Sequence, residues 1–95
     1  MAAYLIVDVV VNDPAVYEQY RAQVPALIRK HGGEYLVRGG ALEVIEGTWA
    51  PKRLVVLRFR DRAAAQAFLN DPEYRPLKEI RHRAATTDLV LVDGA

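Results

Sequence analysis

The sequence contains no cysteine and no serine, which removes several kinds of chemistry at once. Without cysteine the chain forms neither disulfides nor thiolate metal sites, and without either residue it lacks the common hydrolase nucleophiles. Lysine and arginine number 13 and aspartate and glutamate number 12, so the formal net charge is +1. A nearly neutral chain lacks the positive charge that attracts a nucleic-acid backbone. We therefore expect no serine or cysteine hydrolase and no nucleic-acid partner.

Long apolar runs are also missing. Asp8, Arg58 and Asp93 interrupt or bound the longest ones, and none approaches the ~20 residues that a membrane helix needs. The N-terminal residues show no basic region, no long apolar segment and no small-residue cleavage site, so they do not resemble a signal peptide. We therefore predict a cytoplasmic protein without a membrane partner. With 95 residues, of which 52% are hydrophobic, residues 1–95 are expected to form a single domain.

Apolar periodicity divides the chain into alternating strands and helices. Asp13 and Asp61 are each expected to cap the start of a helix, and the turn signal at residues 70–72 to split the second helical region. In chain order we expect a strand at 4–11, a helix at 14–31, strand pieces at 34–38 and 41–46, a strand at 53–60, helical segments from 62 and at 76–84, and a strand at 88–93. This β-α-β-β-α-β order predicts an α+β, ferredoxin-like fold with both helical regions on one face of a four-stranded antiparallel sheet.

Gly39-Gly40 separates the two middle strand pieces and permits two interpretations. The pair is either a β-bulge within one long, bent strand or a tight hairpin turn, and we favour the bulge. Paired glycines also allow backbone amides to approach an anion, but a bulge explains them without a ligand. Phosphate-binding loops need more glycines at fixed spacing and a following helix. Nucleotide binding is therefore not expected.

The first expected strand is apolar on both of its faces. Leu5, Val7, Val9 and Val11 alternate with Tyr4, Ile6, Asp8 and Val10. Helices of the predicted fold cover only one face of the sheet, so the other face needs a different cover. Two-fold homodimers are the commonest soluble oligomers, and their interfaces are self-complementary. We therefore predict a homodimer in which two sheets pack face to face.

Motifs along nearly the whole chain resemble a known bacterial family. They are Tyr35-Leu36-Val37-Arg38-Gly39-Gly40, Glu46-Gly47, Trp49-Ala50-Pro51-Lys52-Arg53 and the strand Leu54 to Phe59, with Asp13-Pro14, Tyr17 and Tyr20 before them and Glu73-Tyr74 and Arg81 after them. On these motifs the sequence is similar to the family called domain of unknown function 1330. Phe68 stands where members often have Trp, and Asp71-Pro72 where many have Ser.

The resemblance implies a ferredoxin-like fold assembled as a dimeric α/β barrel. It places the chain in a superfamily that includes cofactor-free monooxygenases, small-ring isomerases, stress-induced proteins and heme-handling members. It implies no particular reaction and no catalytic residue. The function therefore has to be argued from the residues themselves.

Several polar or amphipathic residues are aimed toward apolar surroundings by the strand and helix periods. In the functional interpretation they form a pocket, in which Arg38 or Arg81 holds a carboxylate or enolate and a tyrosine or Asp8 serves as donor or base. In the structural interpretation Arg81 is held by an internal ion pair, with Asp8 as a candidate partner. The candidate catalytic residues are Asp8, Tyr20, Arg38 and Arg81, and the candidate ligand-binding residues are Tyr17, Tyr20, Tyr35, Arg38, Trp49 and Arg81.

The remaining aromatic and histidine residues say less about function. Trp49 lies in an expected loop, where it marks a contact surface or forms a lid over the end of the sheet. His31 adjoins a helix end and His82 lies between two arginines, so we predict no metal site and no cofactor. Three classes of function stay open: a cofactor-free monooxygenase or isomerase, a binding protein for a small organic anion, and a structural or stress-related dimer.

Overall fold

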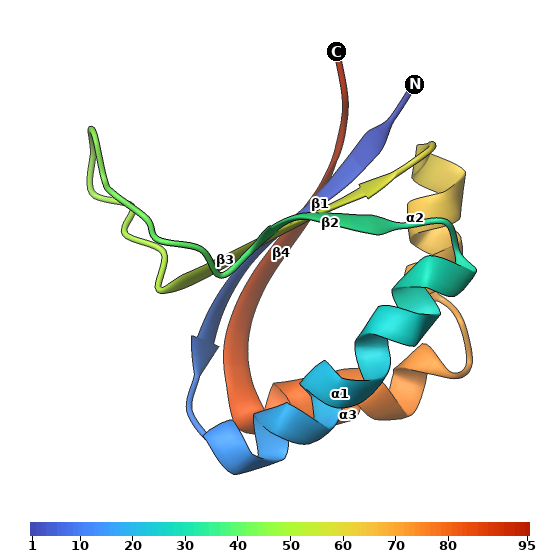
Figure 1. The fold of residues 1–95 in the computed structure, drawn as a ribbon, viewed down its shortest axis with the longest axis horizontal. Coiled ribbons are helices and arrows are strands. Elements are labelled where there is room, and N and C mark those ends of the chain that lie inside the picture. The colour runs from blue at the N-terminus through green and yellow to red at the C-terminus, as the bar shows by residue number, and fades with distance from the viewer.

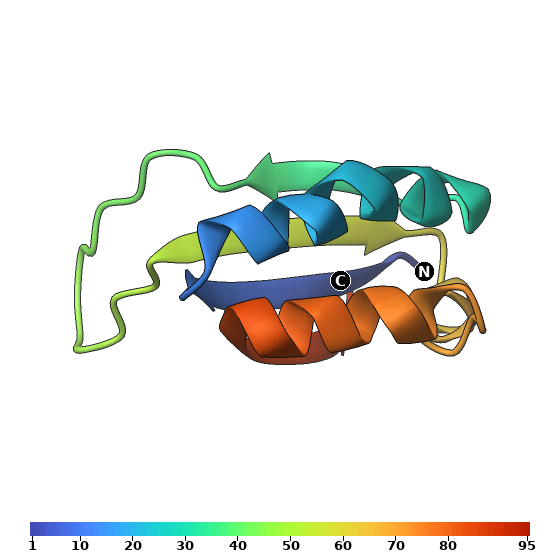
Figure 2. The ribbon, with the colours of Figure 1, turned by 90° about the horizontal axis from the view of Figure 1, so that it is seen from below.

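A computed structural model describes all 95 residues and shows a curved four-stranded sheet with its helices gathered on the concave side (Figures 1 and 2). The elements are β1 (Ala3–Val11), α1 (Pro14–Lys30), β2 (Glu34–Arg38), β3 (Arg53–Phe59), α2 (Arg62–Leu69), α3 (Tyr74–Ala84) and β4 (Ala85–Asp93). The strands are ordered β2-β3-β1-β4, and all neighbours are antiparallel. The predicted ferredoxin-like α+β fold is confirmed. None of the helices combines the length and apolar character needed to cross a membrane.

The helices begin where the capping residues indicated. The Asp13 carboxylate accepts a hydrogen bond from the backbone N–H of Val16 at 3.2 Å, and the Asp61 carboxylate accepts one from Ala64 at 2.8 Å. Each bond satisfies an N–H group that has no partner within its helix. These two caps fix the first turns of α1 and α2, and thereby the points at which the chain leaves β1 and β3.

The core lies between the concave sheet face and the helices. Alternate residues of β1 and β3 point toward the helices and are buried, as strand periodicity predicted. The helices contribute Tyr17, Val24, Leu27 and Ile28 from α1, Ala64, Ala65 and Phe68 from α2, and Tyr74, Leu77 and Ala84 from α3. This single apolar layer supports the sheet and also forms most of the walls of the cavity described below.

The segment between β2 and β3 differs from the prediction. Residues 41–46 form no strand and are exposed, so the expected second strand piece is wrong. The chain instead leaves the sheet after Arg38, extends beyond its end and returns at Arg53 (Figure 1). The alternating apolar residues of this segment lack a neighbouring strand, and without one the backbone has no ladder to join.

A register shift does occur in β2, but not at the predicted glycines. It lies between Tyr35 and Val37, so the bulge predicted at Gly39-Gly40 is misplaced. Gly39 instead adopts a φ of 70°, and its N–H donates to the carbonyl of Leu54 at 2.9 Å. Glycine tolerates this left-handed conformation, which ends the pairing of β2 with β3.

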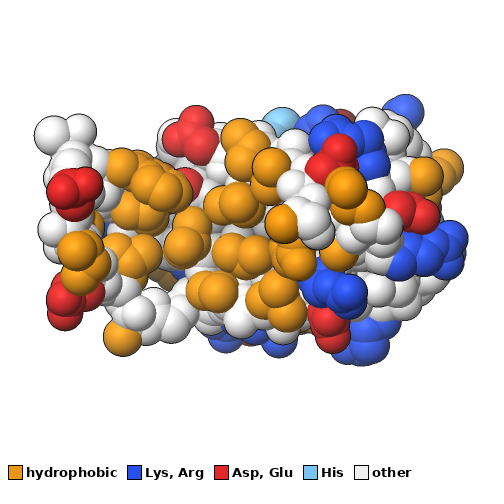
Figure 3. Space-filling view, turned by 90° about the horizontal axis from the view of Figure 1, so that it is seen from above, with side chains coloured by type: hydrophobic (Ala, Val, Ile, Leu, Met, Phe, Trp, Pro, Cys, Tyr) orange, Lys and Arg blue, Asp and Glu red, His pale blue; other side chains and the backbone are white.

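The convex face of the sheet carries no helix. It presents the apolar side chains Ile6, Val10, Val37, Leu54, Val56, Val90 and Val92, which we call the open sheet face. Register places Ile6 between Val56 and Val90 near the centre of this surface. Figure 3 shows hydrophobic side chains gathered over its middle, with charged groups toward the ends. A continuous apolar surface of this kind is typical of an interaction site.

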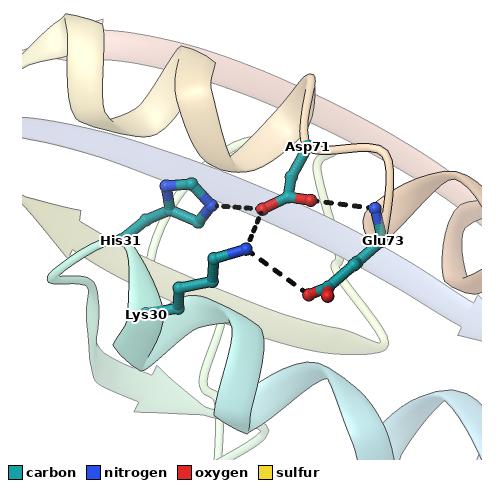
Figure 4. A network of polar contacts seen from close by, with 4 residues as sticks. All are labelled: Lys30, His31, Asp71 and Glu73. Carbon is teal, nitrogen blue, oxygen red and sulfur yellow. Dashed lines mark hydrogen bonds and ion pairs between the residues drawn. The ribbon is translucent and has the colours of Figure 1, made fainter.

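A polar network joins the end of α1 to the turn between α2 and α3 (Figure 4). The Asp71 carboxylate accepts hydrogen bonds from the backbone N–H of Glu73 at 2.8 Å, from His31 Nε2 at 2.7 Å and from Lys30 Nζ at 3.0 Å. These donors, the Glu73 amide first, hold the pKa of Asp71 well below its usual range. Asp71 thus closes the end of the helical layer, a role that its turn motif alone did not predict.

Replacement of Asp71 by Asn is expected to lower the melting temperature at neutral pH. Because folding lowers the pKa of Asp71, the ionised carboxylate stabilises the fold above the unfolded-state value, which is close to 4. That stabilisation is lost as the pH falls through this value toward the lower folded-state pKa. Thermal unfolding at several pH values from neutral to about 3 should show the difference between D71N and the parent shrinking with acid. Asp93→Asn, at an exposed ion pair, is the control; a difference that does not depend on pH would contradict the expectation.

Candidate functional site

A cavity of about 50 Å³ lies between α1, α3 and the concave face of the sheet. Thirteen of its 17 lining residues are hydrophobic, and the other four are all arginines. The polar groups of the lining are the tyrosines Tyr17, Tyr20, Tyr35 and Tyr74 and the arginines Arg21, Arg38, Arg53 and Arg81. A volume of this size holds a few water molecules or a small ligand.

The bulge in β2 directs two of these side chains into the cavity. Residues three apart in a regular strand face opposite sides of the sheet. Here Tyr35 pairs with Leu57 and Arg38 pairs with Val55, and both partners are buried on the concave face. The guanidinium carbon of Arg38 lies 4.1 Å from the centroid of the Tyr35 ring, a cation–π distance. The one extra residue of the bulge thereby aligns Tyr35 and Arg38 on the same face.

The tyrosines supply neutral hydroxyl groups. Tyr17 and Tyr20 are one turn apart on α1, and the hydroxyl groups of Tyr20 and Tyr74 lie 3.1 Å from each other. Burial raises the pKa of Tyr20, and the neighbouring Tyr74 raises it further. Burial also raises the pKa of Tyr35. The hydroxyls of Tyr20 and Tyr35 are therefore protonated at neutral pH and serve as hydrogen-bond donors rather than as bases.

Arg81 is the deepest charged group of the cavity. It lies in the last turn of α3, is only 6% exposed, and has a buried Nε without a hydrogen-bond partner. None of the ion pairs of the chain includes it. The internal ion pair considered from the sequence is therefore wrong. A buried guanidinium without a counter-charge is costly, so its presence requires an explanation other than stability.

Asp8 and Trp49 do not line the cavity. Asp8 alternates with Val7 and Val9, which face the cavity, and so it points to the open sheet face. There the indole N–H of Trp49 donates to Asp8 Oδ2 at 3.0 Å, while Trp49 stays 60% exposed. The sheet separates both residues from Arg81. The structure therefore brings together Tyr17, Tyr20, Tyr35, Arg38 and Arg81, and leaves Asp8 and Trp49 outside this group.

Three polar lining residues were not predicted. Arg53 begins β3 in phase with the inward-facing Val55, and this alternation was a sequence signal that pointed to it. Its Nε is buried without a partner, as in Arg81. Tyr74 reaches the cavity only because α3 packs beside α1, and Arg21 lies at the exposed edge of α1. No local pattern indicated either of them.

The chemical character of the cavity follows from this lining. Guanidinium groups bind carboxylates through parallel hydrogen bonds, and hydroxyl donors stabilise negative charge on oxygen. No aspartate, glutamate or histidine lines the cavity, so it contains no ordinary proton acceptor. Elsewhere in the chain, no group of three or more histidine or carboxylate side chains is arranged to hold a metal ion. The arrangement can therefore bind an organic anion and stabilise an enolate, with apolar walls around the carbon part.

Solved structures share the fold at low sequence identity. The RPA0582 protein of unknown function from Rhodopseudomonas palustris is 16% identical with a TM-score of 0.80, covering 99% of this chain and 82% of that one. SnoaB, a cofactor-independent oxygenase from Streptomyces nogalater, is 18% identical with a TM-score of 0.65, covering 99% and 93%. Rv0793 from Mycobacterium tuberculosis is 16% identical with a TM-score of 0.58, covering 100% and 96%. At these identities the likeness shows the fold alone.

The family of the chain follows from its sequence. A comparison with curated proteins found no match. The family model described as Domain of unknown function (DUF1330), however, matches residues 2–95, nearly the whole chain. The match confirms the resemblance first noted at the motifs around Gly39-Gly40 and Trp49. The chain therefore belongs to the DUF1330 family.

Proposed function

We propose that the protein binds a small organic anion in the cavity beneath α1 and α3. The observation that carries the proposal is Arg81, a buried guanidinium with a free Nε in a cavity without a carboxylate. A bound carboxylate or enolate supplies the missing negative charge and accepts hydrogen bonds from the guanidinium group. The hydroxyl groups of Tyr20 and Tyr74 offer further donors nearby.

We place cofactor-free chemistry of the monooxygenase or isomerase type at the same site. Arg81 and Tyr20 would stabilise the oxyanion of an enolised substrate. SnoaB, which shares the fold, is a cofactor-independent oxygenase, and this supports the class of reaction without identifying a substrate. Because the cavity lining contains no carboxylate or imidazole, the substrate would have to enter already ionised. Asp8 has no part in this scheme, since it faces the other side of the sheet.

Binding without turnover is the second candidate function, and one observation favours it. A site that performs proton transfer needs a proton acceptor within reach of the substrate. The lining offers only arginines, neutral tyrosines and apolar groups. A third class, a dimer in which the polar residues are purely structural, requires a paired polar cluster, and Arg81 is unpaired.

The open sheet face supports a homodimer as the working form of the protein. Val90 and Val92 are exposed there in a single chain, and the helices leave this face free. A second copy packed face to face would cover these residues through a self-complementary contact. The cytoplasmic location is part of the same proposal and rests on the sequence alone.

Isothermal titration calorimetry with unbranched carboxylic acids of about two to six carbons, and with their amides, tests the anion site. At least one acid should bind saturably, and the matching neutral amide should not. Arg81→Met should reduce the affinity at least ~100-fold, whereas Arg83→Met, at an exposed position on α3, should leave it unchanged. Oxygen consumption, together with chromatographic detection of new products from enolisable acids, separates turnover from binding alone. Failure of every acid to bind would overturn the proposed function.

A further inference from the structure

We propose that the ligand is a small dicarboxylate, with one carboxylate at Arg81 and the second at Arg53 and Arg38. This inference rests on the anion-binding function proposed above and specifies the class of anion. It follows from the number of positive charges around the cavity, from their position at two levels, and from the size of the space between them.

The charge around the cavity exceeds what one carboxylate can neutralise. Four arginines line it and no acidic residue does. Arg21 forms an exposed ion pair with Glu18 at 3.1 Å, whereas Arg38, Arg53 and Arg81 form none. A monoanion at Arg81 would leave the half-buried Arg53 without a counter-charge. A dianion matches the lining better, because guanidinium groups bind carboxylates through charge-assisted hydrogen bonds.

The three unpaired arginines occupy two levels of the cavity. Arg81 is buried on α3, Arg53 is half-buried at the start of β3, and Arg38 is exposed at the end of β2. Arg38 pairs with Val55, two residues from Arg53 on the same face, so these two arginines are neighbours at the solvent side. The Nε groups of Arg53 and Arg81 are both buried without partners. Each level therefore offers a guanidinium group without an ion-pair partner to a separate carboxylate.

Gly39 leaves room for the arginines of the outer level. A Cβ atom at this residue would lie 2.9 Å from the guanidinium carbon of Arg53, closer than side chains normally approach. The missing side chain leaves room for Arg53 to extend beside the end of β2. The turn after β2 thus serves the position of Arg53 as well as the path of the chain.

The size of the cavity limits the carbon skeleton. Its volume is about 50 Å³, while a cavity that admits benzene is on the order of 150 Å³. The part of the ligand enclosed beneath the helices is therefore a carboxylate with a short aliphatic chain rather than an aromatic ring. Val7, Val9 and Val55 provide apolar walls for such a chain.

Calorimetric titration of two matched series of acids tests the inference. Malonate, succinate and glutarate are compared with propionate, butyrate and valerate, which have the same numbers of carbon atoms. The best diacid should bind at least ~10-fold more tightly than its monoacid, because it makes a second set of charge-assisted hydrogen bonds. The double variant R38Q/R53Q should remove this advantage, so that the diacid binds no more tightly than its monoacid. Arg58→Gln, on β3 but on the convex face, is the matched control and should alter neither.

The possible outcomes separate this inference from the function on which it rests. If monoacids bind as tightly as diacids, and binding depends on Arg81, the anion site stands and the dicarboxylate assignment is overturned. A diacid advantage that survives in R38Q/R53Q also overturns the assignment of the second carboxylate. Inorganic phosphate binding as tightly as the best diacid would identify the site as a general anion site and would overturn it too. If no acid of either series binds, both proposals fail.

Discussion

Replacement of Arg81 by Met is expected to stabilise the ligand-free protein while abolishing anion binding. The guanidinium is buried, its Nε has no partner, and no carboxylate compensates its charge. Exchange of a buried ion pair for apolar residues of similar size is often neutral or stabilising by about 1–4 kcal/mol, and a buried charge without a partner lacks even the Coulombic attraction of such a pair. For a domain of this size each 1 kcal/mol corresponds to a rise of roughly 4–8 °C in melting temperature. Met is unbranched and adapts to the space left by the arginine stem.

Thermal unfolding with and without ligand distinguishes this role from a structural one. Without ligand, R81M should melt above the parent, and Arg83→Met, at an exposed position of the same helix, should change little. A bound anion at about 100 times its Kd adds roughly 2.7 kcal/mol to the parent and nothing to R81M, so their difference should shrink or reverse. A lower melting temperature of R81M without ligand would show that Arg81 is needed for the fold itself.

Replacement of Val90 by Glu is expected to convert the proposed dimer into a monomer. Val90 is 55% exposed in the single chain and lies opposite Ile6 near the centre of the open sheet face. The new carboxylate would be near Asp8 and Asp88, which already face each other across β1 and β4. Burying it in a sheet-to-sheet contact without a partner costs several kcal/mol, which weakens association at least ~100-fold. In the separate chain the same side chain remains in water and should leave unfolding nearly unchanged.

Light scattering across micromolar concentrations measures this effect directly. The parent should have the mass of two chains, and V90E the mass of one. Lys78→Glu, on the exposed side of α3, changes charge in the same direction and should stay dimeric. A monomeric parent would remove the dimer from the proposed function, and a dimeric V90E would place the contact on another surface.

The parts of the fold that depend on local chemistry were predictable from the sequence. Asp13 and Asp61 mark helix starts because a short carboxylate reaches the free N–H groups of the first turn. The alternation of Leu5, Val7 and Val9 with Ile6 and Asp8 separates the two faces of β1. By contrast, the apolar alternation of residues 41–46 predicted a strand that needs a neighbour to exist, and no local pattern shows whether one is present.

Those residues of the cavity whose direction depends on local spacing were also predictable from the sequence. Tyr17 and Tyr20 lie on the buried side of α1 by helical spacing, and this prediction is confirmed. The contact between Tyr20 and Tyr74 joins residues 54 positions apart, so it depends on how α1 and α3 pack. The sequence also could not show that Arg81 lacks a counter-charge. Whether a carboxylate elsewhere in the chain pairs with Arg81 depends on where the fold places that carboxylate.

Because of the bulge in β2, the number of residues in this strand decides which side chains enter the cavity, and the identity of the extra residue does not. Tyr35 and Arg38 share a face only because Leu36 is extra relative to β3. Loss of either Leu36 or Val37 would restore regular pairing and keep both side chains in the cavity, because the residue that remains takes the outward-facing position opposite Val56. Loss of one residue is therefore tolerated at the two positions between Tyr35 and Arg38. An alignment that places the gap at Tyr35 or at Arg38 instead would assign the wrong side chain to the site.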